Sequence, residues 1–126
     1  MRVLLDTVTF LYVLQSPERL SRLAKKIVET PTNVLELSAL SFSEIALKKA
    51  AGKLSLTRDS LEAAVTRLQL NILAYTQEHA LELFDLPTYH RDQFDRQLIA
   101  QAIVEKIPVV TCDEQFLPYK QVKVIW

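Results

Sequence analysis

The sequence predicts an α/β protein, a three-layer α/β/α sandwich around a mostly parallel central sheet. Residues 3–5 form an apolar run without alternation that ends at Asp6, and a second apolar pattern begins at once beyond it. This arrangement indicates a strand buried on both faces, followed by a helix, with a carboxylate between them. Further along, short apolar segments alternate with segments of helical period. That order is typical of parallel strands joined by right-handed helical crossovers.

The first third of the chain supplies two helices and a second strand. A helix is expected over residues 7–14, and Ser16 with Pro17 marks the turn that follows. Apolar residues at helical spacing then predict a surface helix over residues 20–28, before Pro31. Residues 34–37 are expected to form the second strand.

The next elements are identified by their end signals. Ser41 is followed three residues later by Glu44, which is a helix-start signature, and this helix should run to Gly52. Gly52 is the only glycine and is well placed as the left-handed residue just past a helix end. A further helix is expected over residues 58–68 and a third strand over residues 71–75.

The last third of the chain completes the alternation. Thr76 is expected to cap a helix that ends before Pro87, and the next helix should start near Asp92. Residues 108–111 are an apolar fourth strand, and residues 122–126 are expected to close the chain as an edge strand. No internal repeat, low-complexity tract or linker interrupts the pattern.

Composition narrows the function classes. With 126 residues and 49% hydrophobic content, residues 1–126 are expected to form a single domain with one compact core. Fifteen basic and fifteen acidic residues cancel, which argues against a protein that coats polyanions through a global field. The lone Cys112 excludes an internal disulfide and a multi-cysteine zinc site. No signal peptide or membrane span is expected, so we predict a soluble, cytoplasmic protein.

Four acids stand at the junctions of the expected elements: Asp6, Glu44, Asp95 and Asp113. Asp6 and Asp113 each have a structural alternative, because either can cap the helix or turn that follows it. Glu44 can bond back to the backbone of Ser41, or pair with Lys48 one turn later.

Asp95 is harder to explain as a structural residue. At about 100° per residue it falls within the apolar stripe formed by Phe94, Leu98, Ile99 and Ala102, so it should face the protein body. A buried carboxylate requires a cation, a hydrogen-bond donor or a metal. Asp92, three residues earlier, is the better candidate for the helix cap.

Taken in order, these segments resemble the motifs of the PIN domain and, more narrowly, the VapC-type toxin ribonucleases of bacterial toxin–antitoxin pairs. The motifs are LLDT at residues 4–7, SEIALKKAAGKL at residues 43–54, HRDQFDRQLIAQA at residues 90–102 and VVTCDEQF at residues 109–116. The resemblance covers nearly the whole chain. No single motif is specific, but the ordered set is.

The resemblance implies a PIN-like fold, with a parallel sheet flanked by helices, and places Asp6, Glu44, Asp95 and Asp113 on the family's acidic metal-binding positions. Thr111 falls on its small hydroxyl position. It also implies RNA as the substrate, Mg²⁺ or Mn²⁺ as the cofactor and a small antitoxin protein as a partner, and we further expect a homodimer. Two departures, Val8 where relatives often have histidine and Gln93 where they often have proline, leave the acids intact.

The chemistry of the four acids agrees with this interpretation. Clustered carboxylates raise one another's pKa values unless a divalent cation neutralises them. An all-oxygen site favours Mg²⁺ or Mn²⁺ over zinc, and either ion can activate water and stabilise charge during in-line attack on a phosphodiester. We assign Asp6, Asp95 and Asp113 to metal coordination, and Glu44 to coordination or to orientation of the attacking water.

Other polar and aromatic residues are weaker candidates. Lys48, Lys49, Lys53, Arg91 and Arg96 lie near the acids, but lone basic residues on helices are mostly solvated surface. His79 and His90 lack a partner at metal-ligand spacing, so structural or surface roles are expected. The aromatic residues at apolar positions are expected in the core or at a dimer contact: Phe10, Tyr12, Phe42 and Phe94.

Two other function classes remain open. A receiver-type phosphoacceptor domain also places an acid after a central strand, but it needs paired acids there, and MRVLLDT has one. A catalytically inactive PIN-like module that binds RNA or protein is the stronger alternative. Such modules usually lose acids, whereas this chain keeps all four.

Overall fold

A five-stranded, all-parallel sheet forms the centre of the molecule, in the order β3-β2-β1-β4-β5. The computed structural model describes all 126 residues. The strands are β1 (Arg2–Leu5), β2 (Val34–Ser38), β3 (Asn71–Leu73), β4 (Val109–Val110) and β5 (Val124–Ile125). The prediction of an α/β protein with a parallel sheet is confirmed.

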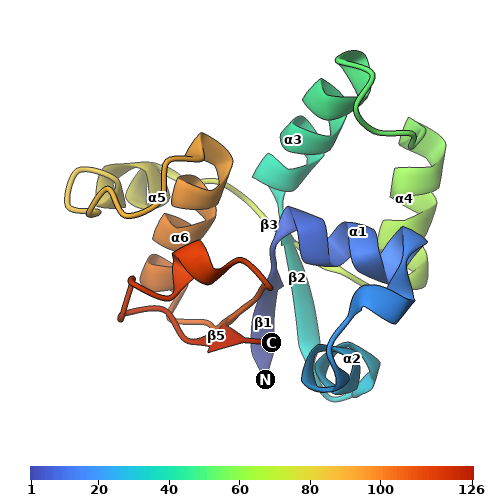
Figure 1. Ribbon diagram of the computed structural model, residues 1–126, viewed down its shortest axis with the longest axis horizontal. Helices are drawn as coiled ribbons and strands as arrows, with labels where there is room; N and C mark the ends of the chain where they lie inside the picture. The colour runs from blue at the N-terminus through green and yellow to red at the C-terminus, as the bar shows by residue number, and fades with distance from the viewer.

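Helices cover the sheet on both sides (Figure 1). They are α1 (Thr7–Gln15), α2 (Arg22–Glu29), α3 (Ala39–Ala50), α4 (Arg58–Arg67), α5 (Gln77–Glu82) and α6 (Gln93–Glu105), with short 3₁₀ turns η1 (Pro17–Arg19) and η2 (Glu114–Phe116). In Figure 1, α1, α2 and α4 lie to one side of β1 and β2, while α5 and α6 lie to the other. None of these helices combines the length and the apolar character that crossing a bilayer would require.

The two faces of β1 belong to two different hydrophobic cores. Val3 and Leu5 pack in a core with Phe10 of α1 and residues of α2, α3 and α4. Leu4 packs in a second core with Leu98 and Ile99 of α6 and with Phe116. Successive strand residues point to opposite faces, so an uninterrupted apolar run at residues 3–5 is what a central strand buried on both sides requires.

Several predicted boundaries shift. The third and last strands are shorter than expected, since β3 ends at Leu73 and β5 spans only Val124–Ile125. The helix predicted to begin at Ser41 begins at Ala39, because the Ser38 hydroxyl accepts a hydrogen bond from the Leu40 amide and caps it. At the other end of α3 the prediction is confirmed, because Gly52 has a φ of 72°.

A buried carboxylate on β2, that of Glu36, is bonded to side chains of the two neighbouring strands. The Glu36 carboxylate is 1% exposed, although it lies in the middle of a strand. Arg2 donates to both of its oxygens at 3.0 and 3.2 Å, and the Asn71 amide donates to Oε1 at 2.6 Å. Arg2 also pairs with Glu105 at 3.0 Å and so connects β2 to the end of α6. A buried carboxylate is tolerated here because the two neighbouring strands, β1 and β3, supply its partners.

We expect Arg2→Ala to lower the free energy of unfolding by about 2–3 kcal/mol, because it leaves the Glu36 carboxylate buried without its cation. The matched control is Lys25→Ala, which removes an exposed ion pair to Glu29 at 3.9 Å and should cost less than about 0.5 kcal/mol. Urea denaturation of both variants measures the difference. Equal costs would show that the buried pair contributes no more than a surface one.

Candidate active site

The site is built around Asp6, which follows β1 and is 2% exposed. Its Oδ1 accepts a hydrogen bond from the Thr9 amide at 2.7 Å, so Asp6 does cap α1 as the structural alternative proposed. Its Oδ2 accepts a hydrogen bond from the Thr111 hydroxyl at 2.5 Å. Capping therefore uses one oxygen, and the other is turned toward the end of β4.

Thr111 connects Asp6 to Asp113. The Thr111 hydroxyl that donates to Asp6 also accepts a hydrogen bond from the Asp113 amide at 3.0 Å. Asp113 in turn caps η2, since its Oδ1 accepts from the Gln115 amide at 2.9 Å. The ends of two adjacent strands, β1 and β4, are thereby tied together through one hydroxyl.

Glu44 reaches the same edge of the sheet from α3. The Thr7 and Ser41 hydroxyls, 2.9 Å apart, join the start of α1 to α3. One turn beyond Ser41, Glu44 is 6% exposed and pairs through Oε2 with Lys48 at 2.9 Å. Its Oε1 is buried without a hydrogen-bond partner. The predicted bond from Glu44 back to the Ser41 backbone is wrong, because Ser41 lies inside α3 rather than at its start, whereas the predicted pair with Lys48 is confirmed.

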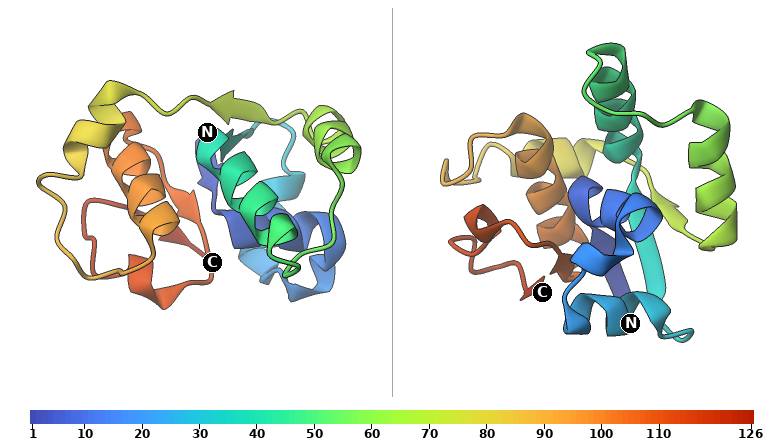
Figure 2. Two further views of the ribbon diagram at one scale, coloured as in Figure 1. Left: turned by 90° about the horizontal axis from the view of Figure 1, so that it is seen from above. Right: turned by 45° about the vertical axis from the view of Figure 1, so that its right-hand side comes forward.

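Asp95 lies in the first turn of α6, which Asp92 caps as predicted. Its side chain is 20% exposed and faces the body of the protein, as the apolar stripe indicated. The helices α3 and α6 contact each other and rise beside the end of β1 (Figures 1 and 2). This packing brings the first turn of α6 toward Glu44 and Asp6.

His90 joins Asp95 to Asp113, a role that the spacing of histidines did not reveal. Its Nε2 lies 3.0 Å from Asp95 Oδ2 and 2.9 Å from Asp113 Oδ2. Its Nδ1 accepts a hydrogen bond from the Asp92 amide at 3.1 Å, so the ring proton of a neutral His90 must be on Nε2. His90 therefore donates a hydrogen bond to Asp113 and lies within ion-pair distance of Asp95, so it contacts both carboxylates. By contrast, His79 has the structural role predicted for it, buried beside Glu105.

Burial and neighbouring charges raise the pKa values of two of these acids, Asp6 and Asp95. Burial raises the pKa of Asp6 above its ordinary value, although hydrogen bonds from Thr111 and Thr9 lower it in part. Burial likewise raises the pKa of Asp95 to about 7. The negative charges of Asp92, Asp6 and Glu44 add to that rise, while His90 opposes it. Asp95 is thus close enough to Asp6 and Glu44 for their charges to disfavour its ionised form.

These donors suit a divalent cation that prefers oxygen ligands. Asp95 and Asp113, with His90, offer ligand atoms within 4.8 Å of one another. The hydrogen-bond pattern leaves the Nε2 of His90 as a donor, so the carboxylates are the better ligands. A cation would also relieve the repulsion that raises the pKa of Asp95 and would give the unpartnered Glu44 oxygen a counter-charge.

The basic candidates divide between two sides of α3. Lys48 and Lys53 line a groove together with Glu44, whereas Lys49 lines a separate apolar groove between α3 and α4. Arg96 donates to the Pro87 carbonyl oxygen at 2.9 Å and so holds the loop before α6. Phe10 and Phe42 pack in or against the first core as predicted. Phe94 does not, because it packs against neither core.

A protein-family model described as the PIN domain matches residues 3–121 of the chain. The chain belongs to the PIN-domain family. No curated protein sequence gives a significant match.

Solved structures agree on the fold of this PIN domain. It is similar to a chain of VapBC2 from Rickettsia felis bound to a promoter DNA fragment, with 15% identity, a TM-score of 0.76 and coverage of 99% of this chain and 98% of that one. A DNA-bound VapBC from Salmonella typhimurium gives 14% identity, a TM-score of 0.73 and coverage of 99% and 97%. VapBC-1 from nontypeable Haemophilus influenzae gives 17% identity, a TM-score of 0.69 and coverage of 99% of this chain and 97% of that one. At these identities the likeness establishes the fold, and the resemblance to the PIN domain that the motifs indicated is confirmed.

We expect Asp95→Asn to stabilise the metal-free PIN domain at pH 8 by an amount on the order of 1 kcal/mol. A carboxyl whose folded pKa is raised to about 7 destabilises the fold at pH values above its unfolded pKa, and the penalty is complete above the folded value. The gain should therefore grow between about pH 4 and pH 7 and be absent below that window.

Denaturant unfolding in chelator at pH 4 and pH 8 measures this effect. Asp59→Asn, at an exposed acid in the first turn of α4, is the control and should change stability by less than about 0.5 kcal/mol at either pH. A variant at Asp95 that is less stable than the parent at pH 8 would mean that its carboxylate is a favourable structural partner.

Proposed function

We propose that this PIN domain is a metal-dependent endoribonuclease that hydrolyses RNA phosphodiester bonds as the toxin of a toxin–antitoxin pair. The observation that supports this best is the pKa of Asp95, raised to about 7 by burial and by the charges of neighbouring acids. Structural carboxylates are normally placed beside cations or donors that favour their charged form, whereas the acids around Asp95 outweigh the one imidazole beside it, that of His90. A site that keeps such groups together is suited to a cation that is bound from solution.

Each acid has a separate role in the proposal. Asp6, Asp95 and Asp113 hold Mg²⁺ or Mn²⁺, directly or through water. Glu44 coordinates the ion or orients the attacking water. Its pair with Lys48 engages Oε2, and the buried Oε1 has no hydrogen-bond partner in the chain. Thr111 and His90 touch the acids rather than the substrate, and they hold Asp6, Asp95 and Asp113 in position.

The bound cation would lower the pKa of a coordinated water and offset the negative charge that grows on the phosphate during in-line displacement. The chain itself contributes orientation. The backbone amide of Thr9 and the hydroxyl of Thr111 keep the Asp6 oxygens fixed, and His90 does the same for Asp95 and Asp113. Groups fixed in this way lose little entropy when the substrate arrives.

The toxin role rests on the family and the fold. The similar structures are described as VapBC complexes, and one as a toxin–antitoxin complex from Klebsiella pneumoniae. We accordingly propose a small antitoxin as partner, a homodimeric assembly, a single domain over residues 1–126 and action in the cytoplasm. The alternative of an inactive module that binds RNA or protein is separated from this proposal by the first experiment below.

The purified protein should cleave single-stranded RNA in Mg²⁺ or Mn²⁺ and stop when a chelator is added. Asp6→Asn should reduce the rate at least about 100-fold, because the amide still caps α1 but removes one ligand charge. Asp59→Asn, which changes an exposed acid on α4, should keep the parent rate. Gel analysis of a labelled RNA measures the cleavage rates of the parent protein, Asp6→Asn and Asp59→Asn.

Two results would contradict this mechanism. Cleavage that persists after exhaustive removal of metal would exclude a metal-dependent reaction. A melting temperature that rises with Mn²⁺ equally in the parent and in Asp6→Asn, with no cleavage by either, would favour a binding module whose ion does not involve Asp6.

Expression of the chain alone should slow the growth of a bacterial host, and co-expression of a small protein encoded beside it should restore growth. The expectation follows from the proposed RNA-cleaving site and from the likeness of the fold to chains of VapBC complexes. Asp6→Asn, expressed at the same level, is the control and should leave growth unaffected. Normal growth with abundant, active parent protein would argue for a housekeeping nuclease.

A further inference from the structure

A groove of about 260 Å³ lies between α3 and the start of α6. It is next to the acid cluster, by which we mean the four candidate acids Asp6, Glu44, Asp95 and Asp113. Its lining residues come from two segments that are distant in the sequence: Glu44, Leu47, Lys48, Ala51, Lys53, Asp92 and Phe94. Glu44 belongs both to this groove and to the acid cluster. The groove is therefore continuous with the site at which a phosphodiester would be cut.

Phe94 is the unusual member of the lining. It is only partly buried, and it packs against neither of the two hydrophobic cores. Its apolar position in the sequence, one residue before Asp95, predicted a place in the core or at a dimer contact. In the structure Phe94 lines the groove, opposite Leu47 of α3, whose side chain is 61% exposed. Neither side chain is explained by packing inside the chain.

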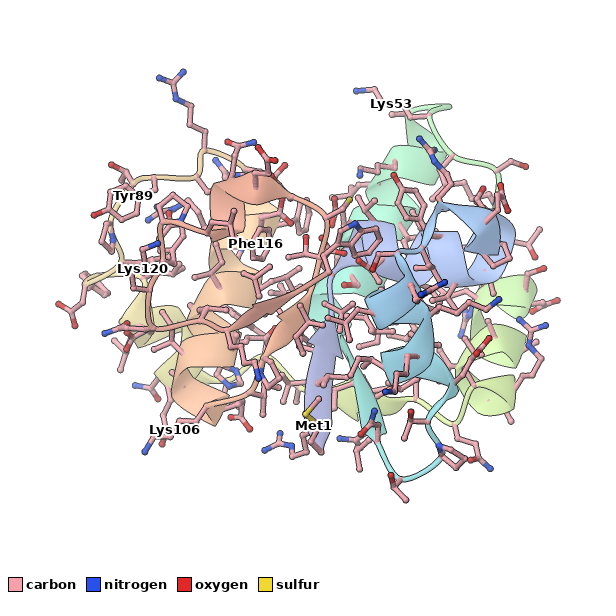
Figure 3. All side chains as sticks on the ribbon, turned by 60° about the horizontal axis from the view of Figure 1, so that its bottom comes forward. Met1, Lys53, Tyr89, Lys106, Phe116 and Lys120 are labelled. Atoms are coloured by element: carbon pink, nitrogen blue, oxygen red, sulfur yellow. The ribbon has the colours of Figure 1, made fainter.

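The groove lining combines an apolar face with charges of both signs, the lysines Lys48 and Lys53 and the acids Glu44 and Asp92. Lys48 is fixed by its pair with Glu44 at 2.9 Å. Lys53 extends from the turn after α3 toward the half of the molecule that contains α6 (Figure 3). Aromatic side chains that stack on bases, beside lysines that contact phosphates, are the usual means of holding single-stranded nucleic acid without reading its sequence.

We propose that this groove binds the nucleotide next to the scissile phosphate of single-stranded RNA, with its base stacked on Phe94 and its backbone phosphate contacted by Lys48 and Lys53. The inference rests on the proposed nuclease function and deepens it by giving the substrate a defined subsite. It also explains why Phe94 is packed against neither core and why Lys48 and Lys53 line a different groove from Lys49. Lys49, on the same helix, lines the other groove and is not part of the proposed subsite.

Binding is measured apart from cleavage in an Asp95→Asn background, in chelator, with a short single-stranded RNA that carries 2-aminopurine. Phe94→Ala should weaken binding roughly tenfold or more and abolish the quenching of 2-aminopurine that stacking causes. Phe94→Trp should retain both, because it keeps an aromatic face. Phe84→Ala is the matched control at a phenylalanine that is 86% exposed outside the groove, and it should bind like the parent.

The lysines are tested by salt dependence. Lys53→Ala should lower the slope of log K against log[salt] by about 1, and Lys49→Ala should leave it unchanged. Unaltered melting temperatures establish that the variants are folded.

Three outcomes would overturn the inference. Phe94→Ala that binds RNA like the parent would exclude stacking. Phe94→Ala that changes the oligomeric state in light scattering while leaving RNA binding intact would make the groove a contact between two copies of the chain. If the parent binds RNA tightly without quenching 2-aminopurine, the base does not stack on Phe94. Failure of the proposed function is a different result, in which the unaltered protein neither binds nor cleaves RNA.

Discussion

The buried carboxylate of Asp6, at the end of the central strand, is the constraint on which the rest of the site depends. Its two oxygens accept hydrogen bonds from different parts of the chain, Oδ1 from the amide of Thr9 and Oδ2 from the hydroxyl of Thr111. The first begins α1, and the second fixes the end of β4 beside β1. Since the Thr111 hydroxyl also accepts from the Asp113 amide, one carboxylate sets the position of a second.

Holding these acids together lowers the stability of the folded protein. The pKa of Asp6 is raised by burial, and that of Asp95 by burial and by neighbouring charges, so both would be easier to bury as neutral residues. The cores on either side of the sheet supply the stability that permits this arrangement. His90 moderates the repulsion because it donates a hydrogen bond to Asp113 and lies 3.0 Å from Asp95. Sites whose local energetics oppose stability in this way are frequently functional.

The sequence predicted the order of the elements and the acids but not how the acids contact one another. The apolar run at residues 3–5 and the stripe around Asp95 carry information because burial leaves a periodic pattern. The role of His90 could not be predicted, because it depends on the loop before α6 packing against η2, a contact between distant segments. Ser41 was misassigned for a similar reason. Its spacing to Glu44 matches that of a capping box, but the residue that caps α3 is Ser38, three positions earlier. Phe94 lies at an apolar position on α6, and only the placement of α3 reveals that no core covers it.

The central claim is that Asp6, Asp95 and Asp113 hold a divalent cation through their carboxylate oxygens. In this claim His90 contacts Asp95 and Asp113 and orients them but does not bind the ion. Anomalous scattering from a crystal of the protein soaked in Mn²⁺ tests it most directly. We expect one or two peaks within coordination distance of carboxylate oxygens of these acids, with His90 Nε2 outside the coordination shell. A crystal saturated with Mn²⁺ that shows no peak at the cluster, or a peak bound to His90 Nε2 in place of Asp6, would contradict it.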